Sequence, residues 1–161
     1  MKNPVLTLYR MLVLKRDRSL VPTTLMPLSV IRKATVYIDG EAEGEDPQSV
    51  RRAVQQYFDY HGIPVTILCP RKRDVNLFGR LKSRARGAAE SRQEDLFISL
   101  AGSPDNVAAE YEACCSKARF KVGRCDLPDD VFDLIVADPE EGEANQIAAF
   151  AAIKDFLDKI Q

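Results

Sequence analysis

Six residues along the chain carry groups that together could hold a small anion. They are Asp39, Gly102, Ser103, Asn106, Arg124 and Asp138. We expect a helix to start just after Gly102, and the unpaired backbone amides of a helix start attract anions. Arg124 would neutralise the bound charge, and Asp39 or Asp138 would act as a general base if a reaction follows. A sugar phosphate is a ligand of this class.

The same residues follow or end short apolar runs that are typical of buried strands. The predicted strands lie near residues 34–39, 64–69, 95–100, 119–123 and 132–137. Helical patterns separate most of them, which predicts an α/β fold: a three-layer Rossmann-like sandwich with a mostly parallel sheet of about five strands. In such sheets ligands bind beyond the carboxyl ends of the strands, where the strand order reverses. The gap between the last two predicted strands is too short for a crossover helix. Either a loop without a helix joins them, or the last strand is an antiparallel edge strand.

The best-defined unit of this fold is the strand–helix–strand pattern in residues 95–124. We expect Ser103 to cap the helix and Pro104 to occupy its first position, because proline has no amide that needs a partner there. One apolar stripe runs along the helix through Val107, Tyr111, Cys114 and Ala118. Glu110 and Glu112 fall outside that stripe and are expected on its polar side.

The N-terminal segment, residues 1–29, is expected to form an extra amphipathic helix and an irregular connector ahead of a single α/β domain at 30–161. The apolar side of the helix consists of Val5, Leu8, Met11 and Leu12, and its end carries Lys15, Arg16 and Arg18. The pattern suits packing on the domain or on a second copy in a homo-oligomer. It also suits peripheral contact with a membrane surface, which apolar faces with nearby basic clusters favour.

Composition narrows the function classes. The net charge of −1 hides an asymmetry: residues 1–92 hold 17 Lys/Arg and 9 Asp/Glu, whereas residues 93–161 hold 6 and 15. The four cysteines form no CxxC pair and there is one histidine, so a structural zinc site is not expected. A divalent cation could bridge the acidic loops after Asp39 and at Asp138, but there is no EF-hand spacing, so no metal or cofactor is expected. The vicinal pair Cys114–Cys115 is expected to serve packing. The absence of a secretory signal pattern favours a cytoplasmic protein.

Several catalytic and binding motifs are absent. The first strand leads into the acidic loop DGEAEGE, without a G-x-G-x-x-G or Walker A pattern, and this loop and DPEEGE at Asp138 would repel phosphate. There is no G-x-S-x-G nucleophile motif, and His61 is expected near a helix end at the opposite edge of the sheet. Residues 71–92 hold eight Lys/Arg but only one aromatic, Phe78, so a solvated crossover is favoured over a nucleic-acid surface.

Three runs resemble an uncharacterised family of small α/β proteins from Bacteroidetes-type bacteria. They are DVNLFGR at 74–80, SKARFKVGR at 116–124 and FDLIV at 132–136. The resemblance covers roughly residues 30–160 and implies a fold and a bacterial cytoplasm, but no activity. The strand DLFISLAG with its following helix and strand is also similar to the N-terminal half of heptosyltransferase-like glycosyltransferases. Those enzymes hold the sugar nucleotide with a second α/β domain, for which this chain has no room.

Two functional hypotheses follow. In the first, the chain is a non-enzymatic binding or interaction module for a small anionic ligand or a protein partner, and it works as a homo-oligomer. In the second, it is an enzyme, or a degenerate glycosyltransferase-like domain, that acts on an anionic ligand of the sugar-phosphate type. No convergent catalytic set is apparent in the sequence, which favours the first.

Overall fold

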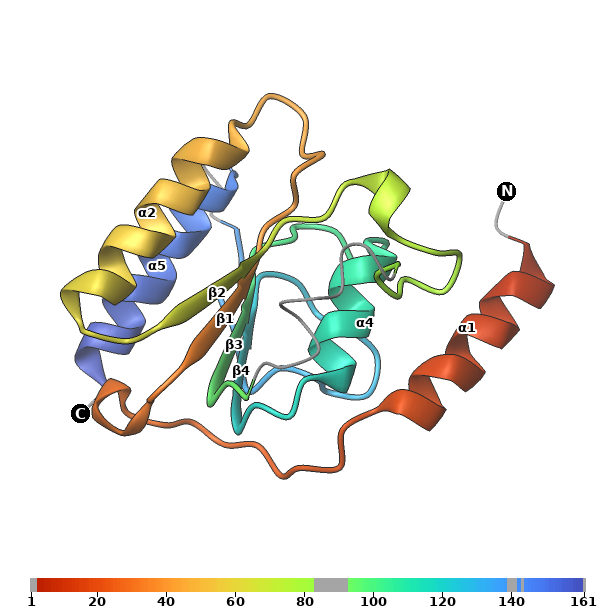
Figure 1. Cartoon of the computed structure of the whole chain (residues 1–161), viewed down its shortest axis with the longest axis horizontal. Helices are drawn as coiled ribbons and strands as arrows, with labels where there is room; N and C mark the ends of the chain where they lie inside the picture. The colour runs from red at the N-terminus through yellow and green to blue at the C-terminus, as the bar shows by residue number, and fades with distance from the viewer. Residues whose placement is uncertain (1–2, 83–92, 139–141, 143, 161) are drawn as a thin grey trace.

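The computed structural model describes residues 3–82, 93–138, 142 and 144–160 and has an α/β fold built on one parallel sheet (Figure 1). The strands are β1 (Ala34–Tyr37), β2 (Val65–Leu68), β3 (Leu96–Ser99), β4 (Phe120–Gly123) and β5 (Leu134–Ile135). Their order across the sheet is β2-β1-β3-β4-β5, and every neighbouring pair is parallel. The predicted fold class is therefore confirmed. The last two strands are parallel and joined by a loop without a helix.

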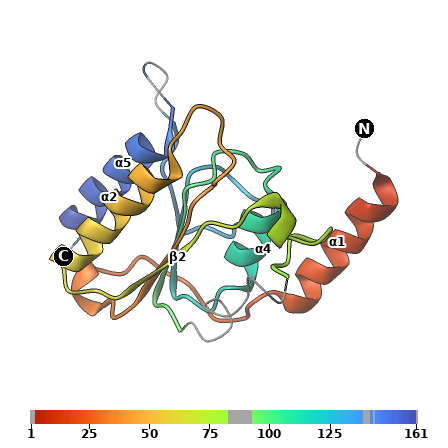
Figure 2. The same ribbon diagram turned by 45° about the horizontal axis from the view of Figure 1, so that its top comes forward.

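Helices cover both faces of the sheet. Helices α2 (Pro47–Tyr60) and α5 (Gln146–Lys159) pack side by side on one face, and α4 (Val107–Cys115) covers the other (Figure 1). Helix α1 (Pro4–Asp17) lies outside α4, as the turned view also shows (Figure 2). The described residues also form two short 3₁₀ helices, η1 (Leu28–Val30) and η2 (Lys72–Asp74). Residues 83–92, part of the predicted basic crossover, lie outside the described residues.

Alternating strand residues build the two cores. On β1, Val36 faces α2 and α5 and joins one apolar cluster, whereas the next residue, Tyr37, joins the cluster beneath α4. On β3, Ile98 and Phe97 divide between the two clusters in the same way. Because both faces of the sheet are covered, its strands are almost continuously apolar, as expected of a parallel sheet.

The start of α4 differs from the prediction. Asn106, not Ser103, caps the helix, and its side-chain oxygen accepts a hydrogen bond from the amide of Ala109 at 3.1 Å. Pro104 instead occupies a β-turn that the amide of Asn106 closes on the Ser103 carbonyl at 3.2 Å. Proline with fixed φ is well suited to the second position of such a turn. The chain therefore leaves β3 as a loop and enters the helix three residues later than expected.

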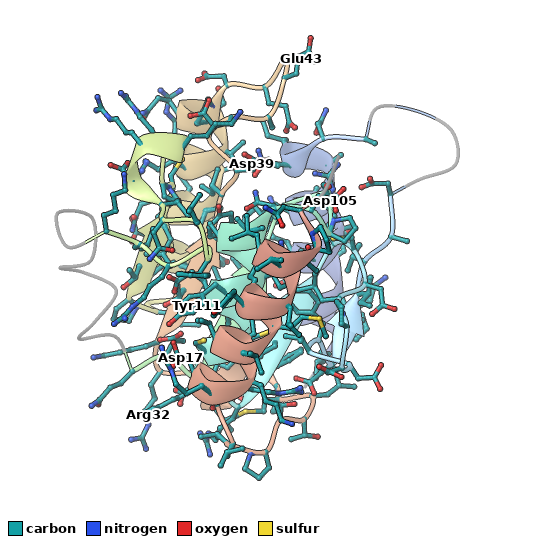
Figure 3. The ribbon with its side chains drawn as sticks, turned by 90° about the vertical axis from the view of Figure 1, so that its right-hand side faces the viewer. Asp17, Arg32, Asp39, Glu43, Asp105 and Tyr111 are labelled. Atoms are coloured by element: carbon teal, nitrogen blue, oxygen red, sulfur yellow. The ribbon has the colours of Figure 1, made fainter. Side chains whose placement is uncertain are left out.

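The expected polar side of α4 is buried. Glu110 and Glu112 are each 6% exposed, and α1 lies against Glu110. Arg10 of α1 pairs with Glu110 at 3.3 Å, and the hydroxyl of Tyr111 donates to Asp17 of α1 at 2.7 Å. Figure 3 shows Tyr111 and Asp17 side by side along α1. The two glutamates that were expected outside the apolar stripe are therefore buried, and α1 forms a fourth layer over Glu110.

Candidate functional site

The strand order places the expected ligand edge between β1 and β3. The chain moves from β1 outward to β2 and then crosses back to β3, so the sequence of strands reverses there. A cavity of about 420 Å³ opens at this point, beyond the carboxyl ends of the strands. Its polar lining residues are Tyr37, Asp39, Glu41, Arg71, Lys72, Asn76, Ser103, Asp105 and Asn106. We name it the carboxyl-edge cavity.

Three of the six predicted site residues line this cavity, namely Asp39, Ser103 and Asn106. Asp39 follows β1, and the other two lie between β3 and α4. Figure 3 shows Asp39 and Asp105 toward the same end of the molecule, with Arg32 at the opposite end. The rule that polar residues gather at the carboxyl ends of strands therefore located one wall of the cavity.

The other three predicted residues form a separate group. Arg124 donates from Nε to Asp138 at 2.7 Å and from a terminal nitrogen to the carbonyl of Leu100 at 3.2 Å. Gly102 leaves room for this guanidinium, because a β-carbon there would lie 2.8 Å from it. Arg124 is 8% exposed, and its charge is balanced by a carboxylate of the same chain. It does not line the cavity, so a ligand there would have to find its cation elsewhere.

The cavity has its own cations, which the sequence analysis did not single out. Arg71 and Lys72 lie in the turn after β2 and form part of the lining. They follow Pro70, two residues past the end of β2, so the same carboxyl-end rule applied to that strand would have found them. Because β1 lies between β2 and β3, these cations and the start of α4 form opposite walls, and the end of β1 lies between them.

Hydrogen bonds fix the residues at the base of the cavity. The Tyr37 hydroxyl donates at 3.2 Å to the same Asn106 oxygen that caps α4. Burial raises the pKa of Tyr37, so the hydroxyl keeps its proton at neutral pH and remains a donor. The Asp39 carboxylate accepts a hydrogen bond from the amide of Glu41 at 3.0 Å. The side chains of Tyr37, Asn106 and Asp39 are thus held in position by bonds within the chain.

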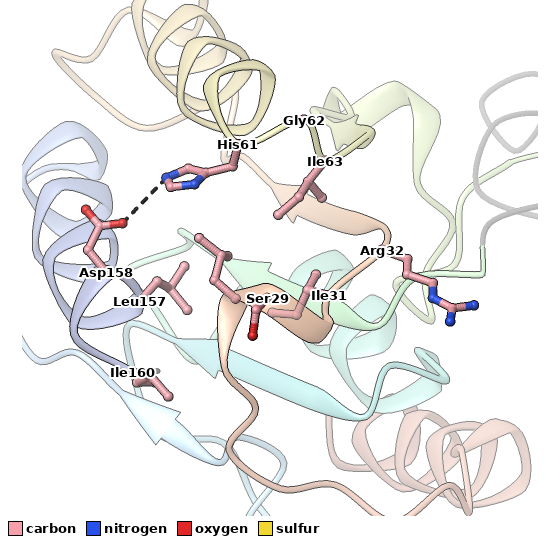
Figure 4. Close-up of a pocket in the computed structure, with 10 residues that line it drawn as sticks. Ser29, Ile31, Arg32, His61, Gly62, Ile63, Leu157, Asp158 and Ile160 are labelled. Atoms are coloured by element: carbon pink, nitrogen blue, oxygen red, sulfur yellow. Dashed lines mark ion pairs between the residues drawn. The ribbon is translucent and has the colours of Figure 1, made fainter.

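A second cavity, of about 690 Å³, lies at the amino ends of the strands (Figure 4). There His61 lies 3.5 Å from Asp158, which also accepts from the Tyr57 hydroxyl at 2.8 Å. His61 follows the last residue of α2, at the edge of the sheet opposite the predicted site, as expected. Much of the lining is aliphatic, and Arg32 points away from the other lining residues (Figure 4). The space is larger, but fewer polar groups converge on it.

Within residues 3–82, 93–138, 142 and 144–160, no group of three or more His, Cys, Asp or Glu side chains could hold a metal ion. None of the helices in these ranges is long and apolar enough to cross a bilayer. Comparison of the chain with protein-family models, curated proteins and solved structures found no match.

Proposed function

We propose that this protein is a non-enzymatic module that binds a small polyhydroxylated anion, of the sugar-phosphate type, in the carboxyl-edge cavity. The observation that carries the proposal is the division of charge across one cavity at the switch in strand order. Arg71 and Lys72 lie on the wall after β2, whereas Asp39 lies at the end of β1 and Asp105 on the wall before α4. An anionic group fits beside the cations, since the carboxylates would repel it from the other side.

The acidic side of the cavity suits the hydroxyl groups of such a ligand. Ionised carboxylates accept hydrogen bonds only, so Asp39 and Asp105 would pair with donors such as sugar hydroxyls. Asn76 and Ser103 add further polar groups to the lining. A ligand with an anionic end and a hydroxylated body satisfies both walls, whereas inorganic phosphate alone would satisfy only one.

The same lining supports binding rather than catalysis. Among the described residues that line the cavity there is no histidine or cysteine, and Ser103 is the only one with a nucleophilic hydroxyl next to a helix start. That hydroxyl accepts a hydrogen bond from the amide of Asp105 at 3.1 Å, as in a local turn. The transferase-like alternative assigned charge neutralisation to Arg124, which pairs with Asp138 instead.

Thermal unfolding against sugar phosphates tests this proposal. At a ligand concentration 100-fold above Kd, binding adds about 2.7 kcal/mol, which raises Tm by roughly 5–10 °C for a chain of this size. We expect a rise with sugar phosphates and little or none with the matching neutral sugars or inorganic phosphate.

Charge variants identify the site. The double variant Arg71→Gln/Lys72→Gln should lose the Tm rise, while Arg52→Gln, at an exposed position on α2 outside the lining, should keep it. A panel of sugar phosphates that leaves Tm unchanged, or a rise that survives the double variant, would contradict the proposal.

A further inference from the structure

Helix α1 presents an unusual apolar surface to the outside. Its fourteen residues include none that is buried. The exposed fractions of the side chains on its outer side are 59% for Val5, 58% for Leu8, 57% for Tyr9, 60% for Met11 and 55% for Leu12. We name these five residues the outer face of α1. Contiguous apolar patches of several hundred Å² on a protein surface often mark interaction sites, so this face is a candidate docking surface.

Polar contacts, by contrast, hold the inner side of α1 in place. Arg10 pairs with the buried Glu110, and Asp17 accepts from the Tyr111 hydroxyl. Just past the helix, the amide of Ser19 donates to the carbonyl of Cys114 at 3.0 Å. These bonds fix the rotation of α1 about its own axis. An ordinary surface helix turns its apolar side inward, whereas α1 is anchored with its most continuous apolar side outward.

The charges near α1 do not favour a lipid bilayer as the covering surface. Binding to anionic lipids draws on clusters of unpaired Lys and Arg beside the apolar face. Arg16 is held by Asp17 through two bonds of 2.7 and 3.1 Å. Arg18 pairs with Asp129 at 3.4 Å. Among the described residues at this end of the helix, Lys15 alone keeps a basic group without an acidic partner in the chain.

The outer face is suited to pairing with its own copy. Val5, Leu8 and Leu12 follow the 3–4 spacing of a helix–helix seam, and the one charged residue between them in the sequence, Arg10, lies on the inner side of the helix. The exposed fractions of these five residues correspond to roughly 500 Å² per copy, so two copies that covered their outer faces completely would bury at most about 1,000 Å² of these residues, which just reaches the lower bound for a specific interface. An antiparallel arrangement sets Leu8 against Tyr9 and Val5 against Leu12 of the other copy, and it keeps the two Lys15 ends apart.

We propose that two copies of this chain associate through the outer faces of α1 as an antiparallel helix pair about a two-fold axis near Leu8 and Tyr9. The contact is isologous, because each copy offers the same surface. It lies on the far side of α4 from the sheet, so it neither covers nor completes the carboxyl-edge cavity. The inference is therefore independent of the function proposed above, and either can fail without the other.

The molar mass in solution tests the association. For the full chain at 10–100 µM, light scattering after size exclusion should give twice the 18.0 kDa of one copy. The variant Leu8→Glu/Leu12→Glu should give one copy. The control Leu20→Glu, at a position 92% exposed in the connector after α1, should remain dimeric. Because all three positions are exposed, circular dichroism should show the same fold throughout.

Disulfide trapping tests the orientation. Leu8→Cys, close to the two-fold axis, should give a covalent dimer on mild oxidation. Lys15→Cys, far from the axis, should give no more covalent dimer than the unchanged chain does. A full chain that stays at one copy at 100 µM, or a Leu8→Glu/Leu12→Glu variant that stays dimeric, would overturn the proposal. A single-copy protein that sediments with phosphatidylserine vesicles would assign the outer face to a membrane and overturn it as well.

Discussion

The side-chain amide of Gln146 holds both backbone polar groups of Asp39. Its oxygen accepts from the Asp39 amide at 2.8 Å, and its nitrogen donates to the Asp39 carbonyl at 3.0 Å. Gln146 is the first residue of α5 and is fully buried. Its backbone amide donates to the side chain of Glu45 at 2.6 Å. Through its side chain and its backbone amide, Gln146 thus joins the end of β1, the acidic loop and the start of α5. It positions Asp39 at the carboxyl-edge cavity.

Replacing Gln146 with leucine should therefore destabilise the protein. The amide and carbonyl of Asp39 would lose their partners in a mostly buried place, and each such loss costs about 1–3 kcal/mol. We expect the free energy of unfolding, measured with urea, to fall by about 2–4 kcal/mol. Gln48→Leu, at an exposed position in the first turn of α2, is the matched control and should change it by less than about 0.5 kcal/mol. Equal effects of the two variants would contradict the role assigned to Gln146.

Most of the fold could be predicted from local sequence because each strand is a short apolar run between turn residues. The start of α4 could not be placed, since Ser103 and Asn106 are both good capping residues three positions apart. Pro104 could not decide between them, because proline fits the second position of a β-turn as well as the first turn of a helix. In the structure it lies in the β-turn. The burial of Glu110 depends on α1, which lies a hundred residues away in the chain, and helical periodicity carries no signal of such a contact.

The candidate site was half predictable for a related reason. The carboxyl-end rule found Asp39, Ser103 and Asn106 because it needs only the ends of β1 and β3. Whether Arg124 was available to a ligand depended on the direction of β5. A parallel β5 brings Asp138 to the same edge as Arg124, where the two neutralise each other. The sequence left that direction open, so the pairing could not be foreseen.

Thr35 offers a stabilising substitution. It lies in the central part of β1 with 0% exposure, and among the described residues its hydroxyl has no hydrogen-bond partner. A buried hydroxyl without a partner is unfavourable, and valine has nearly the same shape. Thr35→Val should therefore raise the free energy of unfolding by about 1 kcal/mol. Thr66→Val, at the half-buried position opposite it on β2, is the control and should give a smaller change. A loss of stability on Thr35→Val would show that the hydroxyl has a partner after all.

The vicinal cysteines of α4 should be slow to react. Burial raises the pKa of Cys114 to about 11 and that of Cys115 to about 12. The thiolate is the reactive form of cysteine. For Cys114, a pKa two units above the ordinary 9.0 lowers the thiolate population at a given pH roughly 100-fold. Alkylation by iodoacetamide at pH 8, followed by peptide mass spectrometry, should label both thiols far more slowly in the folded chain than in urea. Labelling at the unfolded rate would rule out the packing role that we expect for this pair.

Two carboxylates between α1 and α4 should give opposite pH dependences. Burial raises the pKa of Glu110 above its ordinary 4.5, an effect that Arg10 opposes and that Asp105 and Asp129 increase. As the pH rises, the unfolded chain then loses this proton before the folded chain does. The stability that Glu110 contributes is therefore fully present below pH 4.5 and is lost as the pH rises through its folded pKa. The hydrogen bond from Arg16 lowers the pKa of Asp17 below its ordinary 3.8, so its contribution is present above that value and is lost as the pH falls.

Urea unfolding between pH 3 and pH 7 measures both effects against neutral variants. The free energy of unfolding of the unchanged chain, minus that of Glu110→Gln, should decrease as the pH rises, because glutamine does not titrate. The same difference against Asp17→Asn should decrease as the pH falls, so the two variants serve as controls for each other. If the Glu110 difference instead grew with pH, the pairing with Arg10 would outweigh burial. Glu110 would then anchor α1 most firmly as a carboxylate at neutral pH, because its attraction to Arg10 would exceed the cost of desolvation.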